Sequence, residues 1–267
     1  MIRRALVGLC LLAACGGDSS VEPVAAAPAA LAEAPAGPHE VLVCATASLR
    51  RPFEAISERY EQDHPGAVVT LHFDGGAQLL AAMNADEKCD VIALGDNSVM
   101  ARVSSAGHTA VGSPTELARN RVAIVVGQGN PKQVKGLADF GREDLRVALG
   151  ARTSSIGRHS RWVLSRRKLV PKPTVEASTA DGVLAKVAAG DADAGIVYVT
   201  SFAGAGDDVQ RVDVPEDQNT PALYSISTAR EAKEARGAAA FRALALGPAG
   251  QQLLHDAGFL PIGAKLP

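Results

Sequence analysis

Apolar and polar positions change their spacing within residues 41–60, which marks a strand followed by a helix. Residues 41–45 form a continuous apolar run, as expected of a buried strand. After the turn Thr46-Ala47-Ser48, apolar residues recur every three or four positions, which predicts a helix with a buried face made of Leu49, Phe53, Ile56 and Tyr60. Ser48 stands at the expected N-cap, where its hydroxyl and the first free backbone N–H groups suit an anion. Helix capping alone would also account for Ser48.

The same alternation of strands and helices continues through most of the chain. Further strands are predicted at 68–73, 91–94, 121–127, 146–149, 175–177, 193–200 and 222–227. Helices are predicted at 77–84, 97–106, 156–168, in a segment ending near 189, at 228–246 and at 248–257, with a short helix inside 131–140. This order predicts an α/β fold with mostly parallel sheets, in which ligands bind beyond the carboxyl ends of the strands. We expect 193–200 to be the last strand of its lobe.

Small or hydroxyl-bearing residues occupy the turns between these strands and helices. Three such turns are residues 74–76, 150–155 and 178–181. Each delivers the chain to a helix N-terminus, whose free N–H groups can approach a ligand. Asp74 and Asp181 are expected to be exposed acids at helix starts, with a role as acceptor or repellent of an anion as the alternative. Turns of small or hydroxyl-bearing residues that lead into a helix therefore recur along the chain and are not confined to one motif.

The N-terminal segment has the pattern of a bacterial targeting signal. Two arginines precede an apolar stretch at 5–12 that is too short to span a bilayer. The sequence LAAC, ending at Cys15, resembles the lipobox of lipoprotein signal peptides, so we expect 1–15 to be a signal whose cleavage leaves a lipidated Cys15. A plain secretory signal is the alternative. Residues 16–38, rich in alanine and proline, are expected to form a flexible tether.

Composition narrows the class of partner. A net charge of −2, a pI near 6.3 and 4% aromatic residues offer no basic surface for nucleic acid. Beyond the signal the cysteines are Cys44 and Cys89, which lie in or beside apolar runs. We expect two free buried thiols, although an oxidising compartment would permit a bridge between them. No cysteine or histidine cluster has the spacing of a zinc site, so no metal is expected to be coordinated.

Four short motifs, taken in their order and separation, carry a family resemblance. They are ATASL at 45–49, CDVIALGD at 89–96, DAGIVY at 193–198, and a tail with GPAGQQLL at 247–254 and AGFLP at 257–261. Together they resemble the molybdate-binding family of solute-binding proteins of bacterial ABC importers, over almost all of residues 40–262. The resemblance implies a type II periplasmic-binding-protein fold, a two-lobed clamshell in which each lobe is a mostly parallel sheet flanked by helices. Lobe 1 would comprise 39–118 plus 221–267 and lobe 2 would comprise 119–220, with crossings near 118–121 and 214–221.

The same resemblance implies a cleft that binds an oxyanion through neutral hydrogen-bond donors. Transferred to this chain, the donors are the hydroxyl and N–H of Ser48, the Tyr198 hydroxyl, and the N–H groups of Gly76, Ile156 and Ala180. Well-known members carry serine at the position of Gly76, and the loop before Ile156 is shorter here and carries Arg152 and Arg158. The expected ligand is molybdate or tungstate, with sulfate, phosphate, a phosphonate or a ferric complex as alternatives. Without the resemblance, Tyr198 would be interpreted as an aromatic residue of the core whose hydroxyl reaches water.

The resemblance further implies transport, with no cofactor and no catalytic residue. The expected partners are a small oxyanion and the membrane subunits of an ABC permease. The protein itself would be a periplasmic monomer held at the membrane through its lipid anchor alone. A hydrolase that uses Ser48 or Ser155 with a histidine is the alternative from another class. Against it, the chain has no GxSxG elbow, and its histidines fall mostly at helix ends, turns or strand faces.

Overall fold

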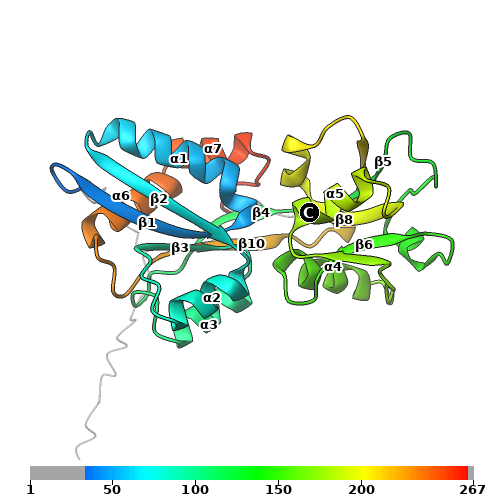
Figure 1. Ribbon diagram of the computed structural model, residues 1–267, viewed down its shortest axis with the longest axis horizontal. Coiled ribbons are helices and arrows are strands. Elements are labelled where there is room, and N and C mark those ends of the chain that lie inside the picture. The colour runs from blue at the N-terminus through cyan, green and yellow to red at the C-terminus, as the bar shows by residue number, and fades with distance from the viewer. Residues whose placement is uncertain (1–33, 264–267) are drawn as a thin grey trace, which may run out of the picture. The chain divides into compact units, whose positions relative to one another are not determined.

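The computed structural model describes residues 34–263, in which two five-stranded sheets define a two-lobed α/β fold (Figure 1). Cys15, the predicted signal and residues 16–33 of the predicted tether lie outside the described residues. The first sheet has the order β2-β1-β3-β10-β4 and consists of β1 (His39–Thr46), β2 (Ala67–Asp74), β3 (Val91–Leu94), β4 (Thr115–Asn120) and β10 (Ala222–Thr228). The second has the order β7-β6-β8-β5-β9 and consists of β5 (Val122–Gly127), β6 (Val147–Gly150), β7 (Val175–Ala177), β8 (Ala194–Tyr198) and β9 (Val209–Asp213). The predicted fold class is confirmed.

Both sheets are built on the same plan. In each, three neighbouring strands run parallel, a fourth is antiparallel to both of its neighbours, and a fifth lies at the edge. The antiparallel strands are β5 and β10. Each is the first strand after the chain crosses from the other sheet, since β5 follows β4 and β10 follows β9. The chain passes between the sheets at Arg121 and again over 214–221. The buried Asn219 side chain joins the two passages, since it donates to Val122 O at 2.7 Å and accepts from Val122 N at 3.1 Å.

Two strands differ from the sequence prediction. The strand predicted at 193–200 is β8, but it is not the last of its lobe, because β9 follows it and pairs antiparallel with β5. The sequence of β9, VQRVD, is mostly exposed and carries too little apolar signal to be recognised. The edge strand β4, TELARN, was not predicted at all, because charged residues interrupt its apolar positions.

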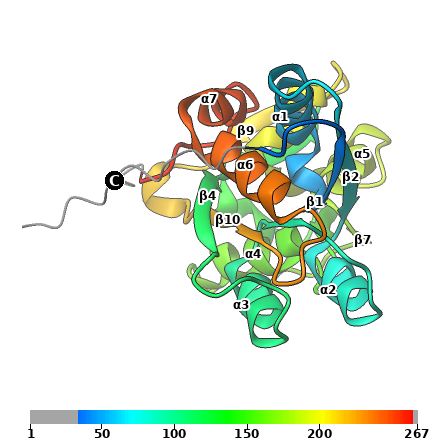
Figure 2. The ribbon, with the colours of Figure 1, turned by 90° about the vertical axis from the view of Figure 1, so that its left-hand side faces the viewer.

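Helices cover both faces of each sheet. In the first lobe, α1 (Arg50–Asp63), α6 (Ala235–Leu246) and α7 (Pro248–Asp256) lie on one face, and α2 (Gly76–Asn84) and α3 (Asn97–Ser105) lie on the other (Figure 2). In the second lobe, α4 (Ser155–Ser165) and α5 (Ala180–Ala188) pack on the sheet from opposite faces (Figure 1). Short 3-10 helices occur at Ala47–Leu49, Leu137–Gly141, Val199–Gly204 and Glu216–Gln218. Within residues 34–263, no helix combines the length and apolar character needed to cross a membrane.

The core of the first lobe forms around the helix face that the sequence predicts. Leu49, Phe53, Ile56 and Tyr60 are all fully buried. Phe53 and Tyr60 pack against Phe241 of α6 with ring centroids 5.9 and 5.6 Å apart, and burial of each such side chain stabilises the fold by about 1.5–3 kcal/mol. The helix expected at 228–246 begins only at Ala235, because Asp90 accepts hydrogen bonds from Ala229 N and Glu234 N and holds the intervening residues in turns.

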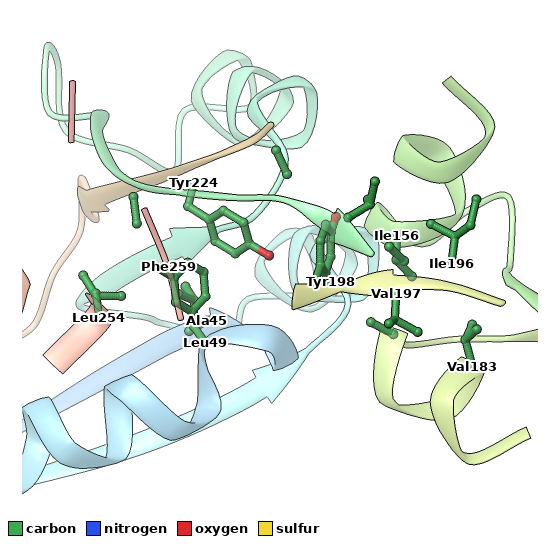
Figure 3. Close-up of a cluster of buried hydrophobic side chains, with 14 of the residues drawn as sticks. Ala45, Leu49, Ile156, Val183, Ile196, Val197, Tyr198, Tyr224, Leu254 and Phe259 are labelled. Carbon is green, nitrogen blue, oxygen red and sulfur yellow. The ribbon is translucent and has the colours of Figure 1, made fainter. Parts of the chain in front are cut away.

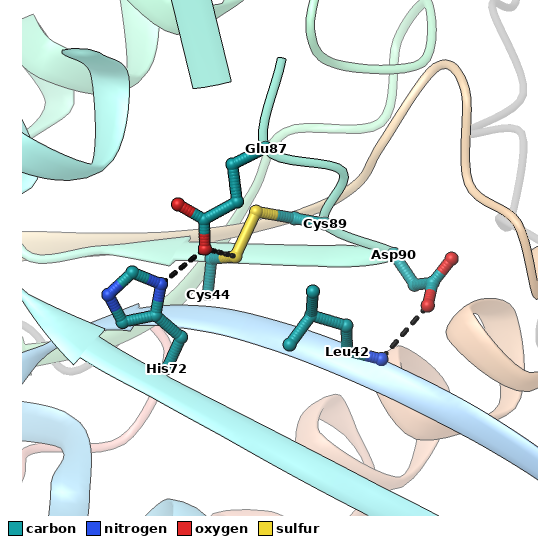
Figure 4. Close-up of a disulfide and its surroundings, with 6 residues drawn as sticks. All are labelled: Leu42, Cys44, His72, Glu87, Cys89 and Asp90. Atoms are coloured by element: carbon teal, nitrogen blue, oxygen red, sulfur yellow. Dashed lines mark hydrogen bonds and ion pairs between the residues drawn. A yellow bond between two sulfur atoms is a disulfide. The ribbon is translucent and has the colours of Figure 1, made fainter. Parts of the chain in front are cut away.

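The prediction of two free cysteines is wrong. Cys44 on β1 and Cys89, just before β3, form a disulfide with alpha carbons 5.9 Å apart (Figure 4). The burial that their apolar surroundings predicted is confirmed: Cys44 is 0% and Cys89 5% exposed. Pairing depends on the adjacency of β1 and β3 in the sheet, which local sequence does not reveal. Among the described residues Glu87 lies close to both sulfurs, but these sulfurs are bonded to each other, and the Glu87 carboxylate contacts His72 Nδ1.

Candidate functional site

A small cavity lies where segments of both lobes meet. Its volume is about 40 Å³, several times the roughly 10–15 Å³ that one water molecule requires, so it suits a ligand of only a few heavy atoms. The first lobe contributes Thr46, Ala47, Ser48, Asp74 and Gly75, and the second contributes Ser154, Ser155, Ile156, Ser178, Thr179, Ala180 and Tyr198. Four of the five residues expected in the cleft, Ser48, Ile156, Ala180 and Tyr198, therefore line one cavity. The fifth, Gly76, is buried directly after Gly75.

Ser48 does not cap a helix, contrary to the sequence prediction. It lies inside the 3-10 helix Ala47–Leu49, and α1 begins after it at Arg50. Its hydroxyl instead forms a 2.9 Å hydrogen bond with the Tyr224 hydroxyl of β10, 176 residues away in the sequence. The absence of a side chain at Gly95 permits this pairing, because a Cβ there would lie 2.6 Å from the Tyr224 ring.

The second element of the first lobe is the start of α2. Its N-cap is Gly75, which has no side chain to accept from the helix, so the N–H groups of the first turn, beginning with Gly76, have no intrahelical acceptor. Asp74 does not cap α2 either, since its exposed carboxylate accepts from Gly75 N at 2.6 Å. The positive end of this helix therefore lies directly behind the cavity wall, of which its N-cap Gly75 is a part.

The second lobe presents two helix starts that are capped by hydroxyls. Ser154 Oγ accepts from Gly157 N at 3.1 Å at the start of α4, and Thr179 Oγ1 accepts from Gly182 N at 3.0 Å at the start of α5. Each cap satisfies the third N–H of its helix, so the N–H groups of Ile156 and Ala180, at the second and first helical positions, have no intrahelical acceptor.

Glycines allow the short turn from β6 into α4. A Cβ at Gly157 would lie 1.9 Å from Ala151 O, and a Cβ at Gly150 would lie 2.6 Å from Gly157 N. Such contacts are too short for any side chain, so the backbone of this turn can pack directly on the first turn of the helix only with glycine at both positions. The close packing sets the position of Ser154, Ser155 and Ile156 at the cavity.

Tyr198, at the carboxyl end of β8, supplies an unpaired hydroxyl. Its Oη is buried and has no hydrogen-bond partner among the described residues, and its ring packs edge-on to Tyr224 with centroids 6.2 Å apart (Figure 3). Burial raises the pKa of Tyr198 well above its usual value, with Tyr224 and the Asp96 carboxylate adding to the effect, so the hydroxyl keeps its proton. A buried unpaired hydroxyl costs about 1–3 kcal/mol, so this group is prepared to donate to a bound ligand.

The cavity wall is almost free of charged side chains. Asp74 is the one charged residue among those that line it, while Arg152 is exposed elsewhere and Arg158 forms an ion pair with Asp96. An adjoining cavity of about 70 Å³ shares Ala47 and Ser48 and is lined by Arg50, Arg51 and Asp181. An anion in the central cavity would therefore be held by neutral donors and by the positive ends of α2, α4 and α5.

The histidines do not form a catalytic pair with the serines. Ser48 bonds to Tyr224, and no hydrogen bond joins a serine to a histidine within the described part of the chain. His159 is the histidine beside Tyr198, and its Nε2 contacts Thr220 O at 2.7 Å. Burial lowers the pKa of His159, which is therefore a neutral residue that ties α4 to the second interlobe passage.

These observations define a class: a two-lobed type II periplasmic-binding fold, with a small cavity at the carboxyl ends of strands in both lobes. The chain belongs to the family of bacterial extracellular solute-binding proteins, whose family model matches residues 41–260. It is 31% identical over 252 residues to the molybdate-binding protein ModA of Mycobacterium bovis, which covers 93% of this chain and 92% of that protein. The family resemblance seen in the sequence is thus confirmed.

Two solved structures share the fold. The periplasmic molybdate-binding protein of Azotobacter vinelandii matches with a TM-score of 0.71 and 17% identity, over 82% of this chain and 98% of that one. The sulfate-binding protein SubI of Mycobacterium tuberculosis matches with a TM-score of 0.71 and 18% identity, over 84% of this chain and 88% of that one. The fold is therefore common to a molybdate-binding and a sulfate-binding protein.

Proposed function

We propose that this protein is the extracytoplasmic binding component of an ABC importer and that it captures molybdate or tungstate as the free oxyanion. The observation that carries the proposal is the buried, unpaired Tyr198 hydroxyl in a cavity where three helices begin with free N–H groups. The 31% identity with ModA of Mycobacterium bovis over nearly the whole chain supports the choice of molybdate.

In this proposal five residues hold the anion. Ser48 donates through its hydroxyl and N–H, Tyr198 through its hydroxyl, and Gly76, Ile156 and Ala180 through backbone N–H groups. A dianion removed from water is stable only when its oxygens accept hydrogen bonds, and several neutral donors with aligned helix dipoles provide them. Either hydroxyl can donate in the 2.9 Å hydrogen bond between Ser48 and Tyr224; when Tyr224 Oη donates, the serine proton is left to donate to the anion.

The donor set also favours a fully deprotonated anion. A protonated oxyanion such as hydrogen phosphate needs an acceptor for its proton, and the one carboxylate among the lining residues is that of the exposed Asp74. Sulfate is the principal competitor, because the fold is shared equally with a sulfate-binding protein. Anions of different size should then bind with different affinity, since donors at fixed positions bind most tightly the anion whose oxygens can accept from all of them.

Capture would use closure of the two lobes about the passages at Arg121 and 214–221, and the closed form would deliver the anion to the permease. We further propose that the protein is a monomer, that it performs no catalysis, and that a lipid on Cys15 followed by the 16–38 tether holds it at the periplasmic face of a membrane. Lobe 1 would comprise 39–118 plus 221–267 and lobe 2 would comprise 119–220.

The test is a thermal-shift titration of the purified protein with molybdate, tungstate, sulfate, phosphate and chromate. A ligand bound only by the folded state at about 100 times its Kd should raise Tm by about 5 to 10 °C. We expect this shift with molybdate and tungstate, and an affinity about tenfold weaker in Ser48→Ala, because a hydrogen bond to an anion is lost. Ser225→Ala, which removes a buried first-lobe hydroxyl bonded to Asn97 away from the cavity, is the matched control. A shift with sulfate alone would reassign the cargo, and no shift with any anion would refute the proposal.

A further inference from the structure

An ion pair joins the two lobes beside the cavity. Arg158 of α4 donates through Nε at 2.9 Å and through Nη2 at 2.5 Å to Asp96 Oδ2, which lies immediately before α3 in the first lobe. The side chains are 34% and 17% exposed, so the pair is shielded from water far more than an ordinary surface ion pair. Neither residue lines the central cavity.

Each partner is fixed within its own lobe by a separate contact. Asp96 uses its other oxygen, Oδ1, to cap α3, accepting from Ser98 N at 2.8 Å and from Val99 N at 3.4 Å. Arg158 uses its remaining nitrogen, Nη1, to donate to Thr153 O at 2.5 Å. The interlobe contact therefore joins two groups that are already oriented, which lowers the entropy cost of forming it.

Both partners are connected directly to segments that line the cavity. On the first-lobe side, Gly95 precedes Asp96 and donates its N–H to Thr46 Oγ1 at 3.1 Å. On the second-lobe side, the Thr153 carbonyl bound by Arg158 precedes Ser154, the cap of α4. The pair thus spans from the turn that carries Ser48 to the helix start that carries Ile156.

We propose that Asp96 and Arg158 are positioning residues, which form an interlobe latch that holds the two halves of the site at their binding separation and slows release of the anion. The effect on release rests on the proposed function, whereas the effect on the ligand-free protein does not. Because the latch makes no contact with the anion, its loss should raise the dissociation rate more than it lowers the association rate.

The first test uses hydrogen exchange in the anion-free protein. Asp96→Asn keeps an oxygen for the α3 cap but removes the charge, and Arg158→Gln removes the other partner. We expect faster exchange at 151–157 in both variants and in the double variant, with the double no faster than the singles, because coupled residues are not additive. Arg146→Gln is the control, since Arg146 pairs with Asp193 at 2.7 Å inside the second lobe alone. Unchanged exchange at 151–157 in both single variants would overturn the latch.

The second test measures release of molybdate by stopped flow. Trp162, the one tryptophan of the chain, lies in the same interlobe groove as Asp96 and Arg158 and supplies the fluorescence signal. We expect dissociation to be about tenfold faster in each single variant and in the double variant. Arg158→Lys, which keeps the charge without the planar fork, should restore part of the slow release. Equal dissociation rates in all variants would refute the latch, even with tight binding. Altered exchange without any anion binding would support the latch and refute the proposed function.

Discussion

The two lobes share one strand plan but prepare their halves of the site in different ways. The second lobe caps α4 and α5 with hydroxyls and leaves one buried hydroxyl, Tyr198, without a partner. The first lobe engages both of its lining hydroxyls, since Ser48 bonds to Tyr224 and Thr46 Oγ1 accepts from Gly95 N, and it starts α2 with two glycines and no side-chain cap. The second lobe thus offers the unpaired Tyr198 hydroxyl beside two capped helices, while the first lobe offers mainly backbone N–H donors.

Covalent reinforcement also differs between the lobes. The Cys44–Cys89 disulfide ties β1 to β3 in the first lobe, directly behind the turn that carries Ser48. The corresponding strands of the second lobe, β6 and β8, have no such link, because residues 119–220 contain no cysteine. The first lobe, whose helix α2 has no side-chain cap, is therefore the lobe whose strands are cross-linked. The disulfide holds in place the strands that lead to the first-lobe wall of the cavity.

Removal of this cross-link should have the largest effect on stability. The bond closes a sequence separation of 45 residues, and loss of that constraint on the unfolded chain predicts that Cys44→Ala/Cys89→Ala unfolds with a free energy about 4 kcal/mol lower. Equilibrium urea denaturation measures the change. Because neither sulfur lines the cavity, the affinity for the anion should change by less than about threefold, within the range of small structural adjustments.

The same variant distinguishes the two lobes. Hydrogen exchange should accelerate in β1 and β3 and stay nearly unchanged in β6 and β8, since stability is not uniform across a structure. An equal acceleration in both lobes would mean that they unfold as one unit. It would contradict the claim that the disulfide stabilises the first lobe alone.

Tyr198→Phe should separate binding from stability. The substitution removes a hydroxyl that is unsatisfied without ligand, so the anion-free protein should be as stable as the wild type or more stable. Affinity for the anion should fall by about tenfold or more, corresponding to about 1.5–3 kcal/mol for a hydrogen bond to a charged group. Isothermal titration calorimetry and anion-free thermal denaturation measure the two quantities.

Tyr60→Phe is the matched control in the first lobe. Tyr60 is equally buried, but its hydroxyl contacts His39 Nε2 at 2.9 Å and Gly237 O at 3.4 Å. Its loss should lower stability by about 1 kcal/mol and leave affinity unchanged. If both variants lose stability alike, the Tyr198 hydroxyl is satisfied in the free protein, and its assignment as a waiting donor is wrong.

Local pattern predicted the parts of the fold that depend on local sequence. The bounds of β3 and β7 coincide with the predicted strands, and the buried face of α1 is the one that its apolar spacing indicates. In contrast, the pairing of Cys44 with Cys89 and of Ser48 with Tyr224 depends on which strands lie side by side. These neighbours come from segments as far as 176 residues apart, and no periodicity within either segment encodes the contact.

The candidate site was predictable to the extent that its residues occupy turns. Small and hydroxyl-bearing residues at strand ends marked the turns that lead into α2, α4 and α5, and the family resemblance selected five residues, of which all but Gly76 line the cavity: Ser48, Gly76, Ile156, Ala180 and Tyr198. The engagement of Arg158 by Asp96 was not predictable, because the two residues belong to different lobes and lie 62 positions apart. Of the two arginines noted near this loop, Arg158 pairs with Asp96 and does not line the cavity.

Gly76→Ser should have the smallest effect, and it tests whether the first lobe lacks a donor. A Cβ at Gly76 would lie 3.4 Å from Val99 Cγ1 and 3.8 Å from Thr46 Cγ2, so serine fits with little movement. Reduced freedom of the unfolded chain should stabilise the variant by about 0.4–1 kcal/mol. A hydroxyl that reaches the anion should strengthen binding by up to about tenfold. Gly76→Ala supplies the same Cβ without the hydroxyl, so equal affinities of the two variants by calorimetry would show that backbone donors alone complete the first-lobe half of the site.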